Sequence, residues 1–99
     1  MTITKDKKDD ILVVGLEGRL DTTTAPQLES ELKDATEGVK ELVFDLAKLE
    51  YISSAGLRVL LSAQKLMNKQ GNMVVKNPND DIMEIFEVTG FVDIFTIEK

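Results

Sequence analysis

The chain contains no cysteine and no histidine among its 99 residues. Without cysteine it has no disulfide, no thiolate nucleophile and no cysteine-based metal site. Without histidine it lacks the usual general base near neutral pH and the commonest metal ligand. Catalysis by Ser-His-Asp or Cys-His groups is therefore excluded.

Long apolar runs and an excess of positive charge are also missing. The longest apolar stretch is about ILVVGL, far short of the roughly 20 residues that cross a bilayer, and the N-terminal MTITKDKKDD has no apolar signal core. The net charge is −6, from 18 acidic against 12 basic residues. Nucleic-acid and anionic-membrane binding draw on clustered lysine and arginine, so the sequence argues against both partners. We expect a cytoplasmic protein, and its acidity permits a partner with a basic surface.

The composition, 42% hydrophobic and 30% charged, is that of one soluble domain with a single core. Residues 2–8 and the apolar run 11–18 predict two strands, the second buried on both faces. Thr24 and Gln27 have the spacing of a capping box, and Pro26 falls in the first turn. A helix therefore follows, and Gly38 ends it.

The rest of the chain alternates in the same way. The pattern predicts a strand at 40–47, a loop at 48–52, a buried helix at 55–69, a strand at 72–76, a helix at 79–89 and a weak strand at 93–97. The order β-β-α-β-α-β-α-β predicts one α/β domain over 1–99, with a four- to five-stranded, mostly parallel (mixed) sheet and about three helices.

Three strand-to-helix junctions, at 21–24, 52–55 and 77–80, share the carboxyl edge of this sheet, where open α/β folds bind ligands and partners. The stretch YISSAGLRVLL places two serines at the second junction. Serine is a favoured helix cap. It is also exposed near the positive end of the helix dipole, where an attached phosphate is accommodated. On residue type alone the simple cap is the commoner role, and both roles stay open.

The segments GRLD at 18–21, LVFDLAKLEYISSAGLRVLL at 42–61 and TGF at 89–91 together resemble the anti-sigma factor antagonists of the STAS domain family. The resemblance covers essentially the whole chain. In that family the run Asp-Ser-Ser/Thr-Gly-Leu carries the phosphoacceptor serine two positions before the glycine. Here that glycine is Gly56, so the resemblance implies Ser54 as the acceptor, with Ser53 as the less favoured alternative. Ser53 stands where the family has aspartate, and Ala55 where it has a second hydroxyl residue.

The resemblance also implies a partner-switching function. The unmodified protein binds an anti-sigma factor, usually a serine kinase, and so frees a sigma factor. The kinase uses ATP to phosphorylate the serine, the complex separates, and a metal-dependent phosphatase of the PP2C type resets it. The antagonist itself is no enzyme and needs no cofactor or metal. The implied partner surface comprises Asp21, Thr22, Thr23, Ser53, Ser54, Ala55, Gly56 and Arg58.

Two alternatives remain at this stage. One is a STAS scaffold subunit of a transport or stress-signalling assembly, which works without phosphorylation and uses the serine only as a cap. The other is an enzyme or phospho-aspartate receiver using Asp21, Asp45 and Glu50. A receiver requires an acceptor at a strand end beside an acidic Mg²⁺ pocket. The sequence disfavours it, because strand-like residues continue after Asp45 and no acidic pair ends the first parallel strand.

Overall fold

The structure, a computed structural model, describes every residue from 1 to 99. The elements are β1 (Thr2–Lys8), β2 (Ile11–Leu20), α1 (Ala25–Ala35), β3 (Glu41–Ile52), α2 (Ser54–Gln70), β4 (Asn72–Lys76), α3 (Asp80–Thr89), the 3₁₀ turn η1 (Phe91–Asp93) and β5 (Thr96–Glu98). They form one sheet in the order β1-β2-β3-β4-β5. Only β1 and β2 pair antiparallel. The predicted mixed α/β fold is confirmed.

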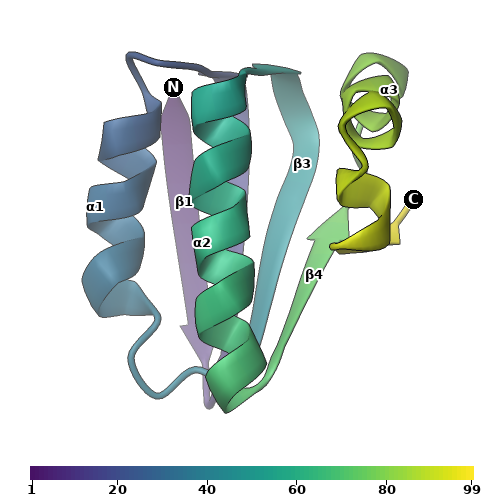
Figure 1. Cartoon of the computed structure of the whole chain (residues 1–99). Helices are drawn as coiled ribbons and strands as arrows, with labels where there is room; N and C mark the ends of the chain where they lie inside the picture. Colours follow the sequence, from purple (N-terminus) through teal and green to yellow (C-terminus); the bar gives the residue numbers. More distant parts are fainter.

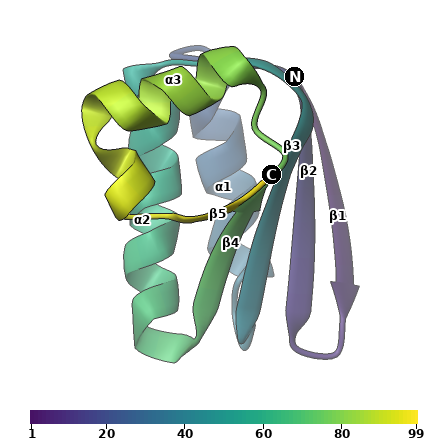
Figure 2. The ribbon, with the colours of Figure 1, turned by 90° about the vertical axis from the view of Figure 1, so that its right-hand side faces the viewer.

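Helices cover one face of this sheet and leave the other face open (Figures 1 and 2). α1 and α2 run side by side across the covered face, and α3 crosses the end where β3 finishes. In β2, Leu12, Val14 and Leu16 are buried beneath the helices, whereas Ile11 is 40% exposed on the other face. The predicted burial of this strand on both faces is therefore wrong, because no helix covers its second face.

The hydrophobic core lies between the sheet and the helices and contains 23 buried residues. Three phenylalanine rings in contact hold the C-terminal part of the chain against this core. Phe86 of α3 and Phe91 of η1 each meet Phe95 edge-on, with ring centres 5.6 and 5.5 Å apart. Edge-to-face pairs of this kind add about 0.5–1.5 kcal/mol beyond the area that they bury. None of the helices is long and apolar enough to cross a membrane.

β3 continues to Ile52, so the loop predicted at 48–52 is wrong. Its pairing with β2 shifts register twice, between Gly15 and Glu17 and again between Gly18 and Arg19. Each irregularity breaks the strict alternation of inward and outward side chains. A search for alternating apolar residues therefore does not detect the last part of the strand. The extension delivers the chain to the sheet edge immediately before the two serines.

Two further boundaries differ from the predictions. Thr24 is the N-cap of α1, but its side chain makes no capping bond, so the predicted capping box is absent. The Thr24 hydroxyl instead accepts a hydrogen bond from the Asp21 backbone N–H and donates one to the Arg19 carbonyl, each at 2.8 Å. At the C-terminus the turn η1 occupies the start of the predicted strand 93–97, so β5 is confined to Thr96–Glu98.

Candidate functional site

The junctions after β2 and β3 lie side by side. Leu20 and Ile52 are register partners in the parallel pair. Immediately beyond them, the Ser53 backbone N–H donates to the Leu20 carbonyl at 2.9 Å. The turn at 21–24 is therefore fastened to the start of α2, as the shared carboxyl edge predicts.

The third junction reaches the same region through Asn79, the N-cap of α3. Its side-chain amide donates to the Leu49 carbonyl of β3 at 3.1 Å, while its side-chain oxygen accepts from the Ile82 backbone N–H at 2.8 Å. One residue thus caps α3 and anchors it to the strand that ends at the serines.

The two serines have different roles in the structure. Ser53 is the half-buried N-cap of α2, and its hydroxyl oxygen accepts a long hydrogen bond, 3.4 Å, from the Gly56 backbone N–H. Ser54 is the first residue of the helix, is exposed, and makes no side-chain hydrogen bond within the protein. Of the two serines, Ser54 is therefore the one whose hydroxyl is exposed and unbonded.

Gly56 allows α2 to begin close against the sheet. A β-carbon at this position would lie 2.7 Å from Leu20 Cγ, 2.9 Å from Ile52 Cγ1 and 2.9 Å from the Leu20 carbonyl oxygen. Carbon atoms in ordinary contact are about 3.5–4.0 Å apart, so no larger residue fits without movement. Gly56 is buried. It is therefore the one implied partner-binding residue that lies beneath the surface formed by the others.

Asp21 organises the turn between β2 and α1. Its Oδ1 accepts hydrogen bonds from the Thr23 hydroxyl at 2.7 Å, the Thr23 backbone N–H at 3.0 Å and the Thr24 backbone N–H at 3.3 Å. The Thr23 hydroxyl is the main cause of the lowered pKa of Asp21 and outweighs the opposing effect of partial burial. Bonds donated to a carboxylate favour its charged form. Asp21 is therefore a fixed negative charge beside the start of α2.

A cation–aromatic pair, which sequence reasoning missed, flanks this turn. Arg19 and Tyr51 are register partners on β2 and β3, and the Arg19 guanidinium carbon lies 4.4 Å from the centre of the Tyr51 ring. Arg19 Nε is also 3.8 Å from Asp21 Oδ2. Contacts this exposed add about 1 kcal/mol or less to stability. The only sequence signal was the closeness of Arg19 to Asp21 in GRLD.

The remaining predicted residues line a shallow hollow of about 250 Å³ next to Ser54. Thr22 comes from the turn, and Ala55 and Arg58 come from the first turns of α2. Arg58 follows Ser54 by four residues, the spacing at which two helical side chains lie on the same face. The structure therefore brings all of the implied residues to one edge, with Gly56 alone beneath the surface.

The acidic residues of the receiver alternative do not gather. Asp45 lies within β3, opposite Gly15 and Lys76, and its Oδ1 accepts from the Ala47 backbone N–H and the Asn77 amide. No group of three or more acidic side chains is close enough to hold a metal ion. Neither the strand-end acceptor nor the acidic pocket of a receiver is present.

The family model for the STAS domain matches residues 2–99. The chain belongs to the STAS domain family. This STAS domain is 42% identical over 99 residues to BtrV of Bordetella bronchiseptica, covering 98% of this chain and 85% of that protein. It is 32% identical over 98 residues to the anti-sigma-B factor antagonist of Listeria monocytogenes, covering 96% and 85%. The crystal structure of an anti-sigma factor antagonist from Mycobacterium paratuberculosis matches it with a TM-score of 0.89 at 26% identity, covering 98% of this chain and 84% of that one.

The family predicted from GRLD, SSAGL and TGF is thus confirmed, and the structure explains one departure of this STAS domain from the family pattern. Ser53 replaces the aspartate and is the N-cap of α2. Aspartate and serine are about equally good N-caps. The replacement therefore keeps the cap and removes a negative charge next to Ser54.

Replacing Ser53 by alanine is expected to lower the free energy of unfolding of the STAS domain by about 0.5–2 kcal/mol, because the cap of α2 is lost. Ser54→Ala is the matched control. It removes a hydroxyl without a partner and should change stability by no more than about 0.5 kcal/mol. Urea denaturation of the two variants checks this, and equal losses would contradict the division of roles.

Replacing Thr23 by valine is expected to raise the pKa of Asp21 toward its ordinary value, 3.8, because the hydroxyl that lowers it is removed. A carboxylate whose pKa is lowered on folding stabilises the fold above its ordinary pKa, and this contribution is lost as the pH falls through the lowered value. The free energy of unfolding of the variant should therefore fall less steeply than that of the unmodified chain as the pH drops below 3.8.

An NMR titration of the Asp21 carboxyl carbon measures this change directly. Thr22→Val is the control, because Thr22 is exposed and makes no bond to Asp21. If the pKa of Asp21 is the same in both variants, the Thr23 hydroxyl is not the cause.

Proposed function

We propose that the chain is an anti-sigma factor antagonist that binds an anti-sigma factor serine kinase while unphosphorylated and is released when Ser54 is phosphorylated. The observation that carries this proposal is the exposed, unbonded hydroxyl of Ser54 at the first residue of α2. The similarity to an anti-sigma-B factor antagonist supports the class of partner. In this proposal the chain catalyses nothing and works in the cytoplasm, and a PP2C-type phosphatase restores it.

The phosphoryl transfer draws its catalytic groups from the kinase. The Ser54 Oγ bonds to the γ-phosphorus of ATP, the bond to the β,γ-bridging oxygen breaks, and ADP leaves. The hydroxyl proton passes to a base of the kinase, because this chain has no histidine and the lowered pKa makes Asp21 a poor base. The Asp21 turn instead forms the surface beside which the kinase aligns the hydroxyl.

The start of α2 suits a phosphoserine. The first amides of a helix lack partners within it, and the dipole there favours negative charge by about 0.3–1 kcal/mol. Ser53 occupies the Gly56 amide, and the amides of Ser54 and Ala55 have no acceptor within the helix. Arg58 stands one turn further along the same helix and supplies a positive charge. Phosphate is thus accommodated without refolding.

Ser54→Ala is expected to accept no phosphate from the anti-sigma factor kinase of the same organism while still binding it. Ser53→Ala should still be phosphorylated, because it keeps the acceptor. Intact-mass analysis after incubation with kinase and ATP measures transfer, and calorimetry measures binding.

Full-rate phosphorylation of Ser54→Ala, mapped to Ser53, would overturn the assignment. A stable complex that carries no phosphate and ignores the Ser54 substitution would favour the scaffold subunit instead.

A further inference from the structure

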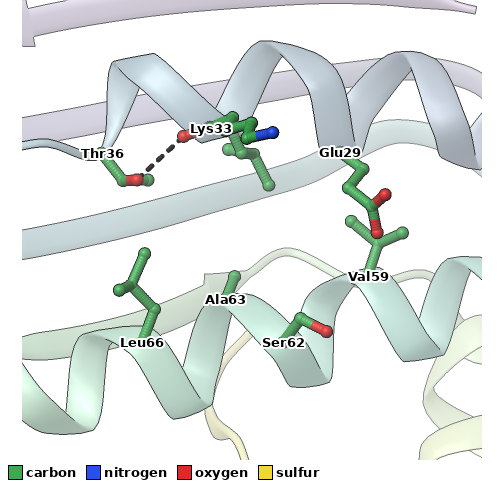
Figure 3. Close-up of a pocket in the computed structure, with 8 residues that line it drawn as sticks. Glu29, Lys33, Thr36, Val59, Ser62, Ala63 and Leu66 are labelled. Atoms are coloured by element: carbon green, nitrogen blue, oxygen red, sulfur yellow. Dashed lines mark hydrogen bonds between the residues drawn. The ribbon is translucent and has the colours of Figure 1, made fainter.

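A groove of about 310 Å³ runs between α1 and α2 (Figure 3). Val59, Ala63 and Leu66 of α2 face α1 across it. At the end nearest the start of α2, the groove shares Glu29 and Val59 with the hollow beside Ala55 and Arg58. The two depressions therefore adjoin, and together they lead from the first turns of α2 down between the helices.

The groove exists because α2 presents small side chains to its neighbour. Ser62 and Ala63 leave space where larger residues would fill the gap between the helices. The Thr36 hydroxyl is already used, since it donates to the Leu32 carbonyl at 2.8 Å. Leu66 remains 40% exposed at the lower end. The floor of the groove is thus apolar, and the Leu66 side chain is left partly uncovered by the rest of the protein.

Charge on the rim indicates what fits there. Glu29 and Lys33 lie along the α1 side of the groove (Figure 3). Neither of them forms an ion pair within the chain, whose three salt bridges involve other residues. Glu29 is the charged residue that lines both depressions. A basic group next to an apolar one would match this end of the groove.

We propose that a helix of the anti-sigma factor lies in the groove between α1 and α2. It places one large apolar side chain against Leu66 and Ala63 and a neighbouring lysine or arginine against Glu29. Amphipathic helices bind apolar grooves in this way, with anchors on one face. The inference rests on the proposed function, because the occupant is the kinase that phosphorylates Ser54. The groove supplies affinity at a distance from the phosphate, and the serine supplies the switch.

Leu66→Asp is expected to weaken binding of the unphosphorylated chain to the anti-sigma factor kinase by about 30-fold, in the range of interface anchors. Val88→Asp is the matched control, because Val88 of α3 is 80% exposed and receives the same charge away from the groove. It should change affinity less than about twofold. Both variants are first checked for an unchanged urea midpoint, and Leu66→Ala repeats the test without a charge.

The same variant separates docking from chemistry. For Leu66→Asp the KM of the kinase for the chain should rise with little change in kcat, because the Ser54 hydroxyl is untouched. The phosphorylated form should lose affinity by the same factor as the unphosphorylated form, since distant sites contribute additively. Affinity and KM equal to those of Val88→Asp would overturn the groove proposal.

Photo-crosslinking distinguishes failure of this inference from failure of the proposed function. A benzoylphenylalanine is placed at Thr22, beside Ser54, or at Leu66, and each is irradiated with the purified kinase. Crosslinks from both positions support the inference. A crosslink from Thr22 alone overturns the groove and leaves the proposed function standing, whereas no crosslink from either position overturns both.

Discussion

Phosphate on Ser54 is expected to lower the affinity for the anti-sigma factor kinase by about two to three and a half decades without changing the fold. In the free chain, the start of α2 and Arg58 accommodate the added charge. At the interface the same charge must lose its water and face groups that had met a neutral hydroxyl. An unpaired buried charge costs about 3–5 kcal/mol, and each 1.4 kcal/mol is about tenfold in affinity.

The test compares kinase affinity and backbone amide NMR shifts for the two forms. Asn72→Asp adds a negative charge at the exposed start of β4, the opposite edge of the sheet, and should leave affinity unchanged. Shift changes confined to the turn at 21–24 and the first turns of α2 agree with this account. Changes spread over the sheet, or equal affinities, would refute the electrostatic mechanism.

Replacing Gly56 by valine is expected to destabilise the chain by about 3 kcal/mol, the upper part of the range for overpacked cores. The added carbons meet Leu20 and Ile52 at less than contact distance. Side chains yield more easily than backbone, but the third obstacle is the Leu20 carbonyl oxygen, which already accepts from the Ser53 N–H at 2.9 Å. Relief of the clash therefore requires breaking the bond that joins the two junctions.

Ala55→Val is the matched control for this substitution. It places valine one position earlier in the same helix, where the side chain lines the open hollow. Helix propensity alone would penalise Ala55→Val more than Gly56→Val, because alanine is the better helix former and glycine the poorer one. Urea denaturation should show a small loss for Ala55→Val and a large one for Gly56→Val. A Gly56 variant as stable as the Ala55 variant would show that the start of α2 tolerates displacement from the sheet.

The element order followed from local signals. Apolar periodicity marked strands and helices, and Gly71 is the C-cap of α2. The predicted end of the first helix at Gly38 is too late, because α1 ends at Ala35 with Thr36 as its C-cap. The location of the candidate site followed from a general rule, since parallel strands bring their carboxyl ends to one edge. The extension of β3 did not follow, because register shifts opposite Gly15 and Gly18 disrupt the alternation on which strand prediction depends.

Details that depend on a single residue or on register also escaped the sequence. The spacing of Thr24 and Gln27 suits a capping box, yet the Thr24 hydroxyl instead bonds to the Asp21 backbone N–H and the Arg19 carbonyl. A sequence places helix boundaries only to within one or two residues, so it left open which of Ser53 and Ser54 is the cap. The structure separates them through the geometry of the Gly56 amide.

The most direct test of the central claim is the release of a sigma factor in a reconstituted system. A fluorescently labelled sigma factor is bound to the anti-sigma factor kinase of the same organism, and its anisotropy is followed as the chain is added. The account predicts that the unphosphorylated chain releases the sigma factor and that the chain phosphorylated on Ser54 does not. Equal release by both forms, or release by neither, would contradict it.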